Sequence, residues 1–318
     1  MPSNILLTGA TGFVGRNLLG KLIYQGCNVR CIVSDRENSG SIKKLNPEII
    51  IGDITKKESV INSMKNIDVV IHLAAMVNVS ECIKNPAKAF ETNTIGVLNM
   101  LEESRKEAGK SGKEIFYVYL SSDRVYGNTK SKIANEETPP NPLDPYSVSK
   151  LNSELILKSY NSCFGSIQYI ILRSANIYGY GQSKNFLIPS VINQILRGKK
   201  EIHVGNLDYY RNFVYIDDLI KALVIVLNNK EKCRNQVLNI SESSQKIGHV
   251  VGLIRKISMK KLNKDIKFIR RNQLSRAKSA EFNKLALDCS KISKIGWEPK
   301  MRFEEGIEKT FQDCSREK

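Results

Sequence analysis

Long apolar stretches are absent from this 318-residue sequence, since no run reaches the roughly 18 residues that a membrane-spanning helix needs. The opening segment, MPSNILLTGATG, has neither the basic nor the apolar stretch of a signal peptide, so we expect a cytoplasmic protein without a membrane partner. The seven cysteines form no CxxC pair and the three histidines are widely dispersed. This pattern argues against a disulfide framework and predicts no metal site.

Acidic residues are also scarce beside basic ones, with 32 Asp and Glu against 49 Lys and Arg and a net charge of +17. The densest basic stretch, residues 255–278, contains a single aromatic residue, Phe268, and so offers little surface for base stacking. We interpret this stretch as a solvated basic face without a nucleic-acid partner. Attraction of phosphate, including nucleic acid, is the alternative hypothesis.

Short β-rich runs alternate with helical stretches through the first two thirds of the chain. The runs are almost continuously apolar, as strands buried on both faces are, and predict an α/β fold with a Rossmann-type doubly wound parallel sheet. The expected strands cover residues 4–8, 29–33, 48–51, 69–73, 115–120 and 168–172, and the longest expected helix covers 87–108.

The rhythm loosens after about residue 175, where helical runs at 186–197 and 217–227 flank a strand-like run at 211–216. We expect a second, smaller C-terminal α/β domain built from two segments of the chain. The predicted Rossmann domain covers residues 1–175 and 206–240, and the second domain covers 176–205 and 241–318.

Three glycines, Gly9, Gly12 and Gly15, follow the first expected strand and begin a helix. Without side chains they permit a tight turn and close approach of the backbone to a pyrophosphate, while the helix N-terminus offers N–H groups to the anion. Their position in a strand–turn–helix unit predicts a dinucleotide site.

The end of the second strand bears on the choice of dinucleotide. In CIVSDREN, Val33 occupies the strand end, Ser34 and Arg36 are suited to hold a 2′-phosphate, and Asp35 lies 20 residues beyond Gly15. We therefore expect NAD(P), with a preference for NADP over NAD. The segments GDI (52–54) and HLAA (72–75) follow the third and fourth strands, at the sheet edge where ligands bind in this fold.

One tyrosine and one lysine four residues apart, Tyr146 and Lys150, begin a patterned helix after Pro145. The same spacing joins Tyr126 to Lys130 and Tyr180 to Lys184, but in polar segments that do not resemble helices. On a helix, residues four apart share a face. A lysine cation about 4 Å away contributes roughly 4 kcal/mol at an effective dielectric near 20, which would bring the tyrosine pKa from about 10 to near 7. Tyr146 is therefore the candidate base.

With these residues in place, the sequence resembles the extended short-chain dehydrogenases/reductases, in particular the NAD-dependent epimerase/dehydratase group that acts on nucleotide sugars. The resemblance covers almost the whole chain. It is carried by TGxxGxxG (8–15), GDI, HLAA, ETNTIGVLNMLE (91–102), SSDRVYG (121–127), PYxxSK (145–150), RSANIYG (173–179), RNFVYIDD (211–218) and DCSKISKIGWEPK (288–300).

The resemblance implies a role for individual residues. Tyr146 is similar to the family's general base, Lys150 to the residue that lowers its pKa and holds the nicotinamide ribose, and Ser122 to the hydroxyl that binds the reacting sugar oxygen. Asn93 is similar to the asparagine that supports the active-site helix. The implied sugar-nucleotide contacts are Ser122, Asn176, Arg211 and Lys278. The expected cofactor contacts are Gly9, Thr11, Gly12, Phe13, Val14, Gly15, Ser34, Asp35, Arg36, Asp53, Ile54, Leu73, Ala74, Ala75, Asn93, Tyr146 and Lys150.

The implied first step is oxidation of the sugar to a 4-keto intermediate, after which the reactions of the family diverge. In its 4,6-dehydratases an aspartate acid and a glutamate base follow the serine or threonine, whereas this chain has Asp123 and then Arg124, which cannot accept a proton. We therefore favour an epimerase, with Asp123 as a catalytic candidate or a structural residue. A 4,6-dehydratase, a 4-keto-sugar reductase and a non-catalytic NAD(P)-sensing protein are the alternatives, and a homodimer is expected from the resemblance.

Overall fold

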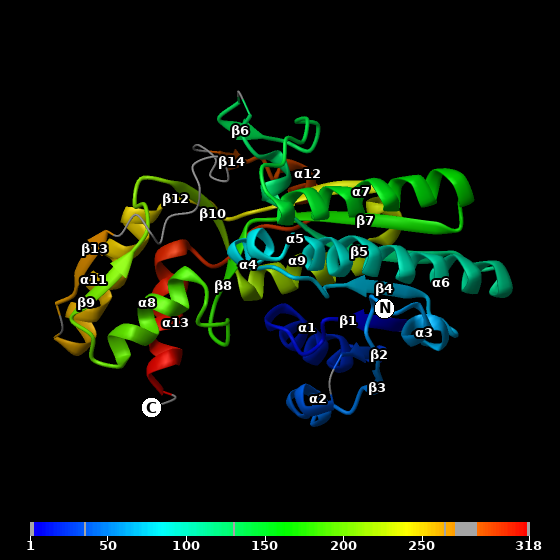
Figure 1. Cartoon of the computed structure of the whole chain (residues 1–318), viewed down its shortest axis with the longest axis horizontal. Coiled ribbons are helices and arrows are strands. Elements are labelled where there is room, and N and C mark those ends of the chain that lie inside the picture. Colours follow the sequence, from blue (N-terminus) through cyan, green and yellow to red (C-terminus); the bar gives the residue numbers. More distant parts are fainter. Residues whose placement is uncertain (1–2, 35, 130, 264, 271–284, 317–318) are drawn as a thin grey trace. The chain divides into compact units, whose positions relative to one another are not determined.

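The computed structural model describes residues 3–34, 36–129, 131–263, 265–270 and 285–316. Its central feature is a seven-stranded sheet in the order β11-β7-β5-β4-β1-β2-β3 (Figure 1). The pairs β1–β2, β1–β4, β2–β3 and β4–β5 are parallel. The order reverses at β1, between β2 and β4, which is the point in such sheets where ligands bind. The predicted Rossmann-type sheet is confirmed.

The elements of the first part of the chain alternate strand and helix. In order they are β1 (Asn4–Thr8), α1 (Phe13–Tyr24), β2 (Asn28–Val33), α2 (Arg36–Lys43), β3 (Glu48–Ile51), α3 (Lys57–Val60), η1 (Ile61–Met64), β4 (Val69–His72), α4 (Val79–Lys84), α5 (Pro86–Phe90), η2 (Glu91–Ile95), α6 (Gly96–Ser111), β5 (Ile115–Ser122), η3 (Asp123–Tyr126), β6 (Ile133–Ala134), α7 (Pro145–Phe164) and β7 (Ile167–Ser174).

The elements that follow are shorter and more mixed. They are β8 (Asn176–Tyr178), α8 (Leu187–Leu196), β9 (Glu201–Val204), β10 (Tyr210–Tyr215), α9 (Ile216–Asn228), α10 (Lys230–Cys233), β11 (Gln236–Ile240), β12 (Ser243–Lys246), α11 (Ile247–Leu262), β13 (Lys267–Arg270), β14 (Ala286–Leu287), α12 (Ser290–Ser293) and α13 (Phe303–Arg316).

The core of the sheet is apolar on both faces. Every residue of β4 and β7 is buried, so side chains that point to opposite faces are all covered. Alternate strand residues such as Leu6, Val70 and Tyr117 pack with Val97 and Leu101 of α6. Figure 1 shows α6 and α7 side by side along β5, and both helices contact that strand.

The expected helix over 87–108 is interrupted. The chain runs through α5, a π-helical turn η2 (Glu91–Ile95) and α6. Within η2 the backbone carbonyl of Asn93 accepts a 2.6 Å hydrogen bond from the hydroxyl of Ser153. The Asn93 side chain also makes contacts outside the helix, and π turns of this kind are frequent at functional sites.

The chain divides into two compact units. The first comprises Met1–Val125, Pro142–Arg173 and Ile220–Leu238, and the second comprises Tyr126–Asn141, Ser174–Leu219 and Asn239–Lys318. These bounds differ from the expected domains chiefly in assigning residues 126–141 and 206–219 to the second unit. The functional division into a cofactor domain and a substrate domain stays a prediction.

The second unit contains a three-stranded sheet, β12-β10-β8, and two two-stranded sheets, β13-β9 and β14-β6. Its interior is organised around Asp218, which is fully buried. One carboxylate oxygen of Asp218 accepts hydrogen bonds from the backbone N–H groups of Lys300 (3.0 Å) and Met301 (2.8 Å). Its backbone carbonyl accepts a 2.9 Å bond from the indole N–H of Trp297. Asp218 thus links the start of α9 to the segment before α13.

Within the described residues, none of the helices has both the length and the apolar character that crossing a bilayer requires.

Replacing Asp218 with alanine is predicted to lower the free energy of unfolding by about 2–4 kcal/mol, because two partly buried N–H groups lose their acceptor at about 1–2 kcal/mol each. Asp217→Ala is the matched control, since Asp217 is exposed and adjacent in the sequence. Urea unfolding measures both. A loss for Asp218→Ala no larger than that of the control would contradict the role assigned to this carboxylate.

Candidate active site

The glycine turn between β1 and α1 is shaped by close packing. Gly9 has a positive φ of 69°, and a Cβ there would lie 2.8 Å from the backbone nitrogen of Ala74. A Cβ on Gly15 would lie 2.1 Å from the carbonyl oxygen of Gly9. Gly12 is the exposed N-cap of α1, it forms no side-chain cap, and the first turn contains no acidic residue. The turn therefore leaves the α1 N-terminus open to an anion.

The loop after β4 is fastened to this turn. The hydroxyl of Thr8 accepts hydrogen bonds from the N–H groups of Leu73 and Ala74, both at 3.1 Å. Leu73, Ala74 and Ala75 are half-buried and follow the strand that pairs with β1. The glycine turn and the HLAA segment are thus held together at the carboxyl edge of the sheet, as a dinucleotide site requires.

The loop after β3 is ordered by its own side chains. One carboxylate oxygen of the exposed Asp53 accepts 2.9 Å hydrogen bonds from the N–H and the hydroxyl of Thr55. The side-chain amide of Asn99 donates to the carbonyl oxygens of Ile54 (3.0 Å) and Thr55 (3.1 Å). Ile54 is buried and contacts α6 at Gly96. Asp53 and Ile54 therefore have fixed positions, and their contacts with a cofactor stay a prediction.

The residues expected to select NAD or NADP are only partly described. Ser34 is exposed directly after β2, Asp35 lies outside the described residues, and Arg36 begins α2. The exposed hydroxyl of Ser34 is compatible with a 2′-phosphate.

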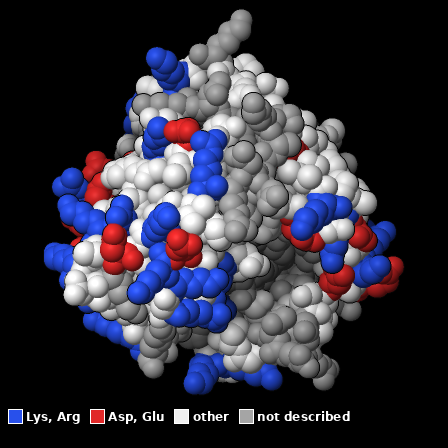
Figure 2. Space-filling model, turned by 60° about the vertical axis from the view of Figure 1, so that its left-hand side comes forward, with Lys and Arg blue, Asp and Glu red and all other residues white. Residues whose placement is uncertain are grey.

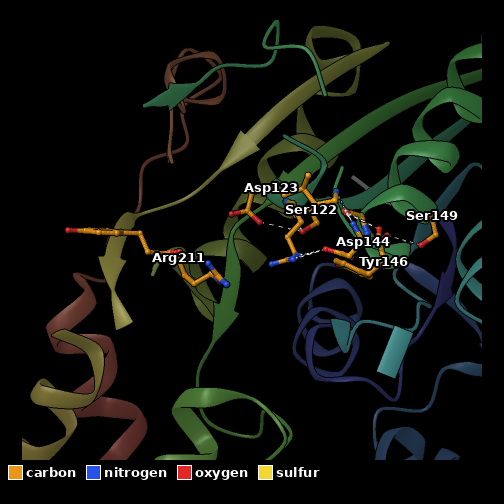
Figure 3. Close-up of polar contacts among 10 residues, drawn as sticks. Ser122, Asp123, Asp144, Tyr146, Ser149 and Arg211 are labelled. Atoms are coloured by element: carbon orange, nitrogen blue, oxygen red, sulfur yellow. Dashed lines mark hydrogen bonds and ion pairs between the residues drawn. The ribbon is translucent and has the colours of Figure 1, made fainter. Parts of the chain in front are cut away.

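Tyr146 and Lys150 both lie on α7, near its beginning, and both are buried. Asp144 is the N-cap of α7: its carboxylate accepts a 2.9 Å hydrogen bond from Ser147 N–H, and the Ser147 hydroxyl closes a capping box. Figure 3 shows Asp144, Tyr146 and Ser149 at this end of the helix, beside Ser122 at the end of β5 and Asp123 directly after it.

The other two tyrosines with a lysine four residues later, Tyr126 and Tyr180, lie in different surroundings. Tyr126 ends η3, is fully buried and donates a 2.7 Å hydrogen bond to Asn239, while Lys130 lies outside the described residues. Tyr180 is 38% exposed and lies in a loop. The helical context that separates Tyr146 from the other two is therefore confirmed.

Asn93 joins the π turn to α7. Its side-chain N–H donates to the hydroxyl of Ser149 at 2.9 Å and to the carbonyl oxygen of Met76 at 3.1 Å, and its side-chain oxygen accepts from Met76 N–H at 2.7 Å. The Ser149 hydroxyl in turn donates to the backbone carbonyl of Tyr146 at 2.8 Å. Asn93 thus connects the π turn and the loop after β4 to α7, and the role that the resemblance implies for it stays a prediction.

Burial controls the charge of the central pair. It raises the pKa of the Tyr146 hydroxyl well above its ordinary value, against opposing effects of a hydrogen bond from Ser122 and of the Arg124 cation. It lowers the pKa of Lys150 to about 7, although Glu154 favours the cation. The Lys150 ammonium lies 4.5 Å from the centroid of the Tyr119 ring.

The expectation that Lys150 brings the pKa of Tyr146 near 7 is therefore wrong. That expectation used a dielectric typical of the protein surface and omitted desolvation. Two buried groups of this kind lose hydration, which favours the neutral phenol and the neutral amine. The charged form of either group therefore needs partners that stabilise it, such as Arg124 beside Tyr146 and Glu154 beside Lys150.

Ser122 and Asp123 are buried and adjacent. The Ser122 hydroxyl lies 3.4 Å from a carboxylate oxygen of Asp123 and accepts a 3.2 Å hydrogen bond from the backbone N–H of Arg124. The Ser122 hydroxyl is thus held beside Tyr146 and opposite the start of α7. The catalytic roles of both residues stay predictions.

Sequence reasoning missed a buried ion pair that lies one turn of α7 after Lys150. Glu154 follows Lys150 by one helical turn, is fully buried, and forms a 2.7 Å ion pair with Arg173 at the end of β7. Ser121 donates a 2.5 Å hydrogen bond to the same carboxylate. The four-residue spacing from Lys150 was visible in the sequence and could have indicated a shared face.

His72 is a further buried polar residue near this pair. Its Nδ1 lies 2.7 Å from the Tyr117 hydroxyl, and burial, followed by the Lys150 cation, lowers the pKa of His72 to about 3. The imidazole is therefore neutral at physiological pH.

Besides Ser122 in the first unit, two expected sugar-nucleotide contacts, Asn176 and Arg211, lie in the second unit. Asn176 on β8 donates a 2.9 Å hydrogen bond to the carbonyl oxygen of Asn212 on β10. Arg211 is half-buried on β10, and its guanidinium donates to the Tyr210 carbonyl at 2.7 Å. The neighbouring strands thus bring Asn176 and Arg211 to one sheet. Lys278 lies outside the described residues.

Much of the described part of the basic stretch is paired with acidic side chains. Arg255 pairs with Asp265, Lys261 with Glu308, Lys267 with Glu201 and Arg270 with Asp208. Figure 2 shows Lys and Arg side chains next to Asp and Glu side chains on the face that it presents. This mixture supports the interpretation as a solvated face.

The fold is that of the extended short-chain dehydrogenases/reductases. The chain belongs to the GDP-mannose 4,6 dehydratase family, whose model matches residues 6–310.

Named relatives cover nearly all of the chain. It is 32% identical over 313 residues to a Methanocaldococcus jannaschii protein named "Putative UDP-glucose 4-epimerase", with 96% of each protein covered. It is 30% identical to a dTDP-D-glucose 4,6-dehydratase of Dictyostelium discoideum, with 96% of this chain and 80% of that protein covered. The solved UDP-glucuronic acid 4-epimerase of Bacillus cereus, in complex with UDP-glucuronic acid and NAD, is 26% identical with a TM-score of 0.84, over 99% of this chain and 100% of that one.

The low pKa of Lys150 predicts a pH-dependent cost of its burial. Between about pH 7 and 10 the unfolded chain keeps this proton while the folded chain has lost it, so the lysine makes unfolding less favourable as the pH rises. The unfolding free energy of Lys150→Met minus that of the wild type should therefore fall by about 3 kcal/mol from pH 6 to pH 9.

Lys158→Met is the matched control, because Lys158 is on the same helix and only half-buried. Urea unfolding at both pH values should give the same difference for this variant. An equally constant difference for Lys150→Met would mean that the Lys150 amine is solvated and retains its ordinary pKa.

Proposed function

We propose that this protein is an NAD(P)-dependent nucleotide-sugar epimerase that acts through a 4-keto-sugar intermediate. The observation that carries the proposal is the burial of Tyr146 and Lys150 on one end of α7, with Ser122 at the end of β5 beside them (Figure 3). This arrangement supplies a proton acceptor beside a hydroxyl donor. The family and the relatives named above support the substrate class.

Tyr146 takes the proton of the sugar C4 hydroxyl in this proposal, and Ser122 holds the reacting oxygen. A nicotinamide, when bound, supplies the acceptor and donor of hydride and adds positive charge in its oxidised form. Lys150 binds the ribose and stabilises the phenolate, because a buried anion gains from a nearby cation. The exclusion of water by burial strengthens these interactions.

Epimerisation is favoured over 4,6-dehydration by the state of Arg124. Its guanidinium forms a 2.6 Å buried ion pair with Asp144, so this position holds a fixed cation and no base. Elimination across C5 and C6 requires a group that removes the C5 proton. A 4-keto-sugar reductase requires no such base and is the second candidate. A 4,6-dehydratase is the third candidate, because the relative in Dictyostelium discoideum is named as one.

The glycine turn fits the pyrophosphate of a dinucleotide, since a Cβ at Gly9 or Gly15 would collide with backbone and the α1 N-terminus is uncapped. Ser34 supports the preference for NADP, because a hydroxyl suits a 2′-phosphate. The Bacillus cereus epimerase was solved with NAD. Calorimetric titration with both dinucleotides decides between them, and a tenfold preference for NAD would overturn the preference for NADP.

We also infer a homodimer, with cytoplasmic location expected as before. Leu155 on α7 is 55% exposed and is a candidate contact of the dimer interface. Sedimentation equilibrium gives the mass in solution, and a monomer at micromolar concentration would contradict the inference.

Identification of the product tests the proposed reaction. The protein is incubated with UDP-, GDP-, CDP- and dTDP-sugars and either dinucleotide in D₂O, and products are analysed by mass and NMR. An epimer without deuterium on carbon is expected, because hydride returns to the carbon that lost it. Loss of water with deuterium at C5 would identify a dehydratase, and no product from any sugar would favour a non-catalytic NAD(P)-sensing protein.

Tyr146→Phe is predicted to reduce turnover by about 10²–10⁴-fold, as loss of a general base does, while dinucleotide affinity changes little. Tyr126→Phe is the control, since it removes a buried hydroxyl outside the proposed chemistry. Initial rates and calorimetric titration measure the two properties. A Tyr146→Phe variant with the turnover of the wild type would remove the assigned base.

A further inference from the structure

Arg124 lies between the two hydroxyl-bearing segments of the site and contacts both. Its backbone N–H donates a 3.2 Å hydrogen bond to the Ser122 hydroxyl. Its guanidinium donates from Nη2 (2.6 Å) and Nε (3.2 Å) to one carboxylate oxygen of Asp144. The side chains of the ion pair are 7% and 1% exposed. One residue therefore bridges the end of β5 and the start of α7.

We propose that Arg124 is a positioning residue, whose buried ion pair with Asp144 sets the distance between the Ser122 and Tyr146 hydroxyls. This inference rests on the proposed function, because the distance matters only if both groups act on one sugar oxygen. It adds a role for the residue that stands where the dehydratases have a base.

The partner of Arg124 is well suited to transmit position. The second carboxylate oxygen of Asp144 accepts from Ser147 N–H, and Asp144 N–H lies 3.1 Å from the Ser147 hydroxyl. Pro145 follows as the first helical residue and restricts φ before Tyr146. The side chain that holds Arg124 is thus the N-cap of the helix that carries Tyr146. A shift of Arg124 would rotate or tilt the first turn of α7.

Stability alone does not explain this ion pair. Exchanging a buried ion pair for apolar residues of similar volume is often neutral or stabilising, whereas removal of one partner is costly. The pair also has an electrostatic consequence. Arg124 is a cation that favours ionisation of Tyr146, against the effects of Asp123 and Cys82.

The charged and titratable groups around Tyr146 come from four elements, and the buried Tyr119 on β5 is one of them. Asp123 and Arg124 follow β5, the buried thiol of Cys82 lies on α4, and Asp144 and Lys150 belong to α7 and its cap. Burial raises the pKa of Cys82 to about 11, so the thiol is neutral at the pH of the assay. Arg124 is thus the fixed cation of the segment that carries Ser122, and its loss should make Tyr146 harder to ionise.

The test compares Arg124→Gln, Arg124→Lys, Asp144→Asn and the double variant Arg124→Gln/Asp144→Asn in the full-length protein. Arg124→Gln should lower kcat by about 10–10²-fold with KM changed less than about threefold, because a displacement near 1 Å can cost about 10²-fold. In its profile of kcat against pH, the apparent pKa of the acid limb should rise by about one pH unit. Arg124→Lys keeps the cation and should leave that limb in place.

The double variant separates positioning from folding. Neither charge is left unpaired, and Asn is a good N-cap, so unfolding stability should recover relative to each single variant. The acid limb should stay raised and kcat should stay low. Arg30→Gln is the matched control, because Arg30 forms a partly buried ion pair with Glu48 far from these residues in the sequence. It should change stability without changing the pH profile.

Recovery of kcat and of the acid limb together with stability in the double variant would overturn the inference and leave Arg124 a structural role only. A readout without turnover distinguishes this failure from failure of the proposed function. The protein is labelled with 3-fluorotyrosine, and the ¹⁹F resonance of Tyr146 is assigned with Tyr146→Phe and titrated. Arg124→Gln should raise the titration midpoint and Arg124→Lys should not. An unchanged midpoint in Arg124→Gln would contradict the inference even if the wild type acts on no sugar tested.

Discussion

The burial of Tyr146 and Lys150 on one helix is the constraint on which the site depends. A phenol and an amine are poor acid–base catalysts when both are solvated at neutral pH, and both become neutral when both are desolvated. In this structure burial raises the pKa of Tyr146 above its ordinary value and lowers that of Lys150 to about 7, so desolvation favours the neutral form of each group. The charge of the pair therefore depends on the charged and hydrogen-bonding groups that lie beside it.

Such a pair must be held rigidly, and α7 is fastened at several levels along its buried face. Asp144 fixes its first turn, the side chain of Asn93 reaches Ser149, and the Ser153 hydroxyl bonds the Asn93 carbonyl. One turn further on, Glu154 is held by Arg173 and Ser121. These contacts are polar and buried, so each one fixes the orientation of α7 as well as stabilising it. The π turn η2 takes part in these contacts, because the Asn93 carbonyl accepts the hydrogen bond from Ser153 on α7.

The sheet, the glycine turn and the helical context of Tyr146 could be predicted from the sequence, because each depends on local patterns of apolar, small and capping residues. The charge of Lys150 could not, because desolvation depends on the neighbours that cover a side chain after folding. The interruption at η2 was also hidden, since Asn93 is compatible with a regular helix until the hydroxyl of Ser153 is placed beside it. The ion pair of Arg124 joins residues 20 apart, beyond the reach of any local pattern.

The central claim is that Tyr146 takes the proton of the sugar C4 hydroxyl while C4 loses a hydride to the nicotinamide. A single-turnover experiment with a nucleotide sugar deuterated at C4 tests it most directly, with the near-ultraviolet absorbance of reduced nicotinamide as the signal. The account predicts a transient rise in this absorbance that forms more slowly with the deuterated sugar than with the protiated one. The rise should be absent from Tyr146→Phe. A transient with no isotope effect and undiminished amplitude in that variant would contradict it.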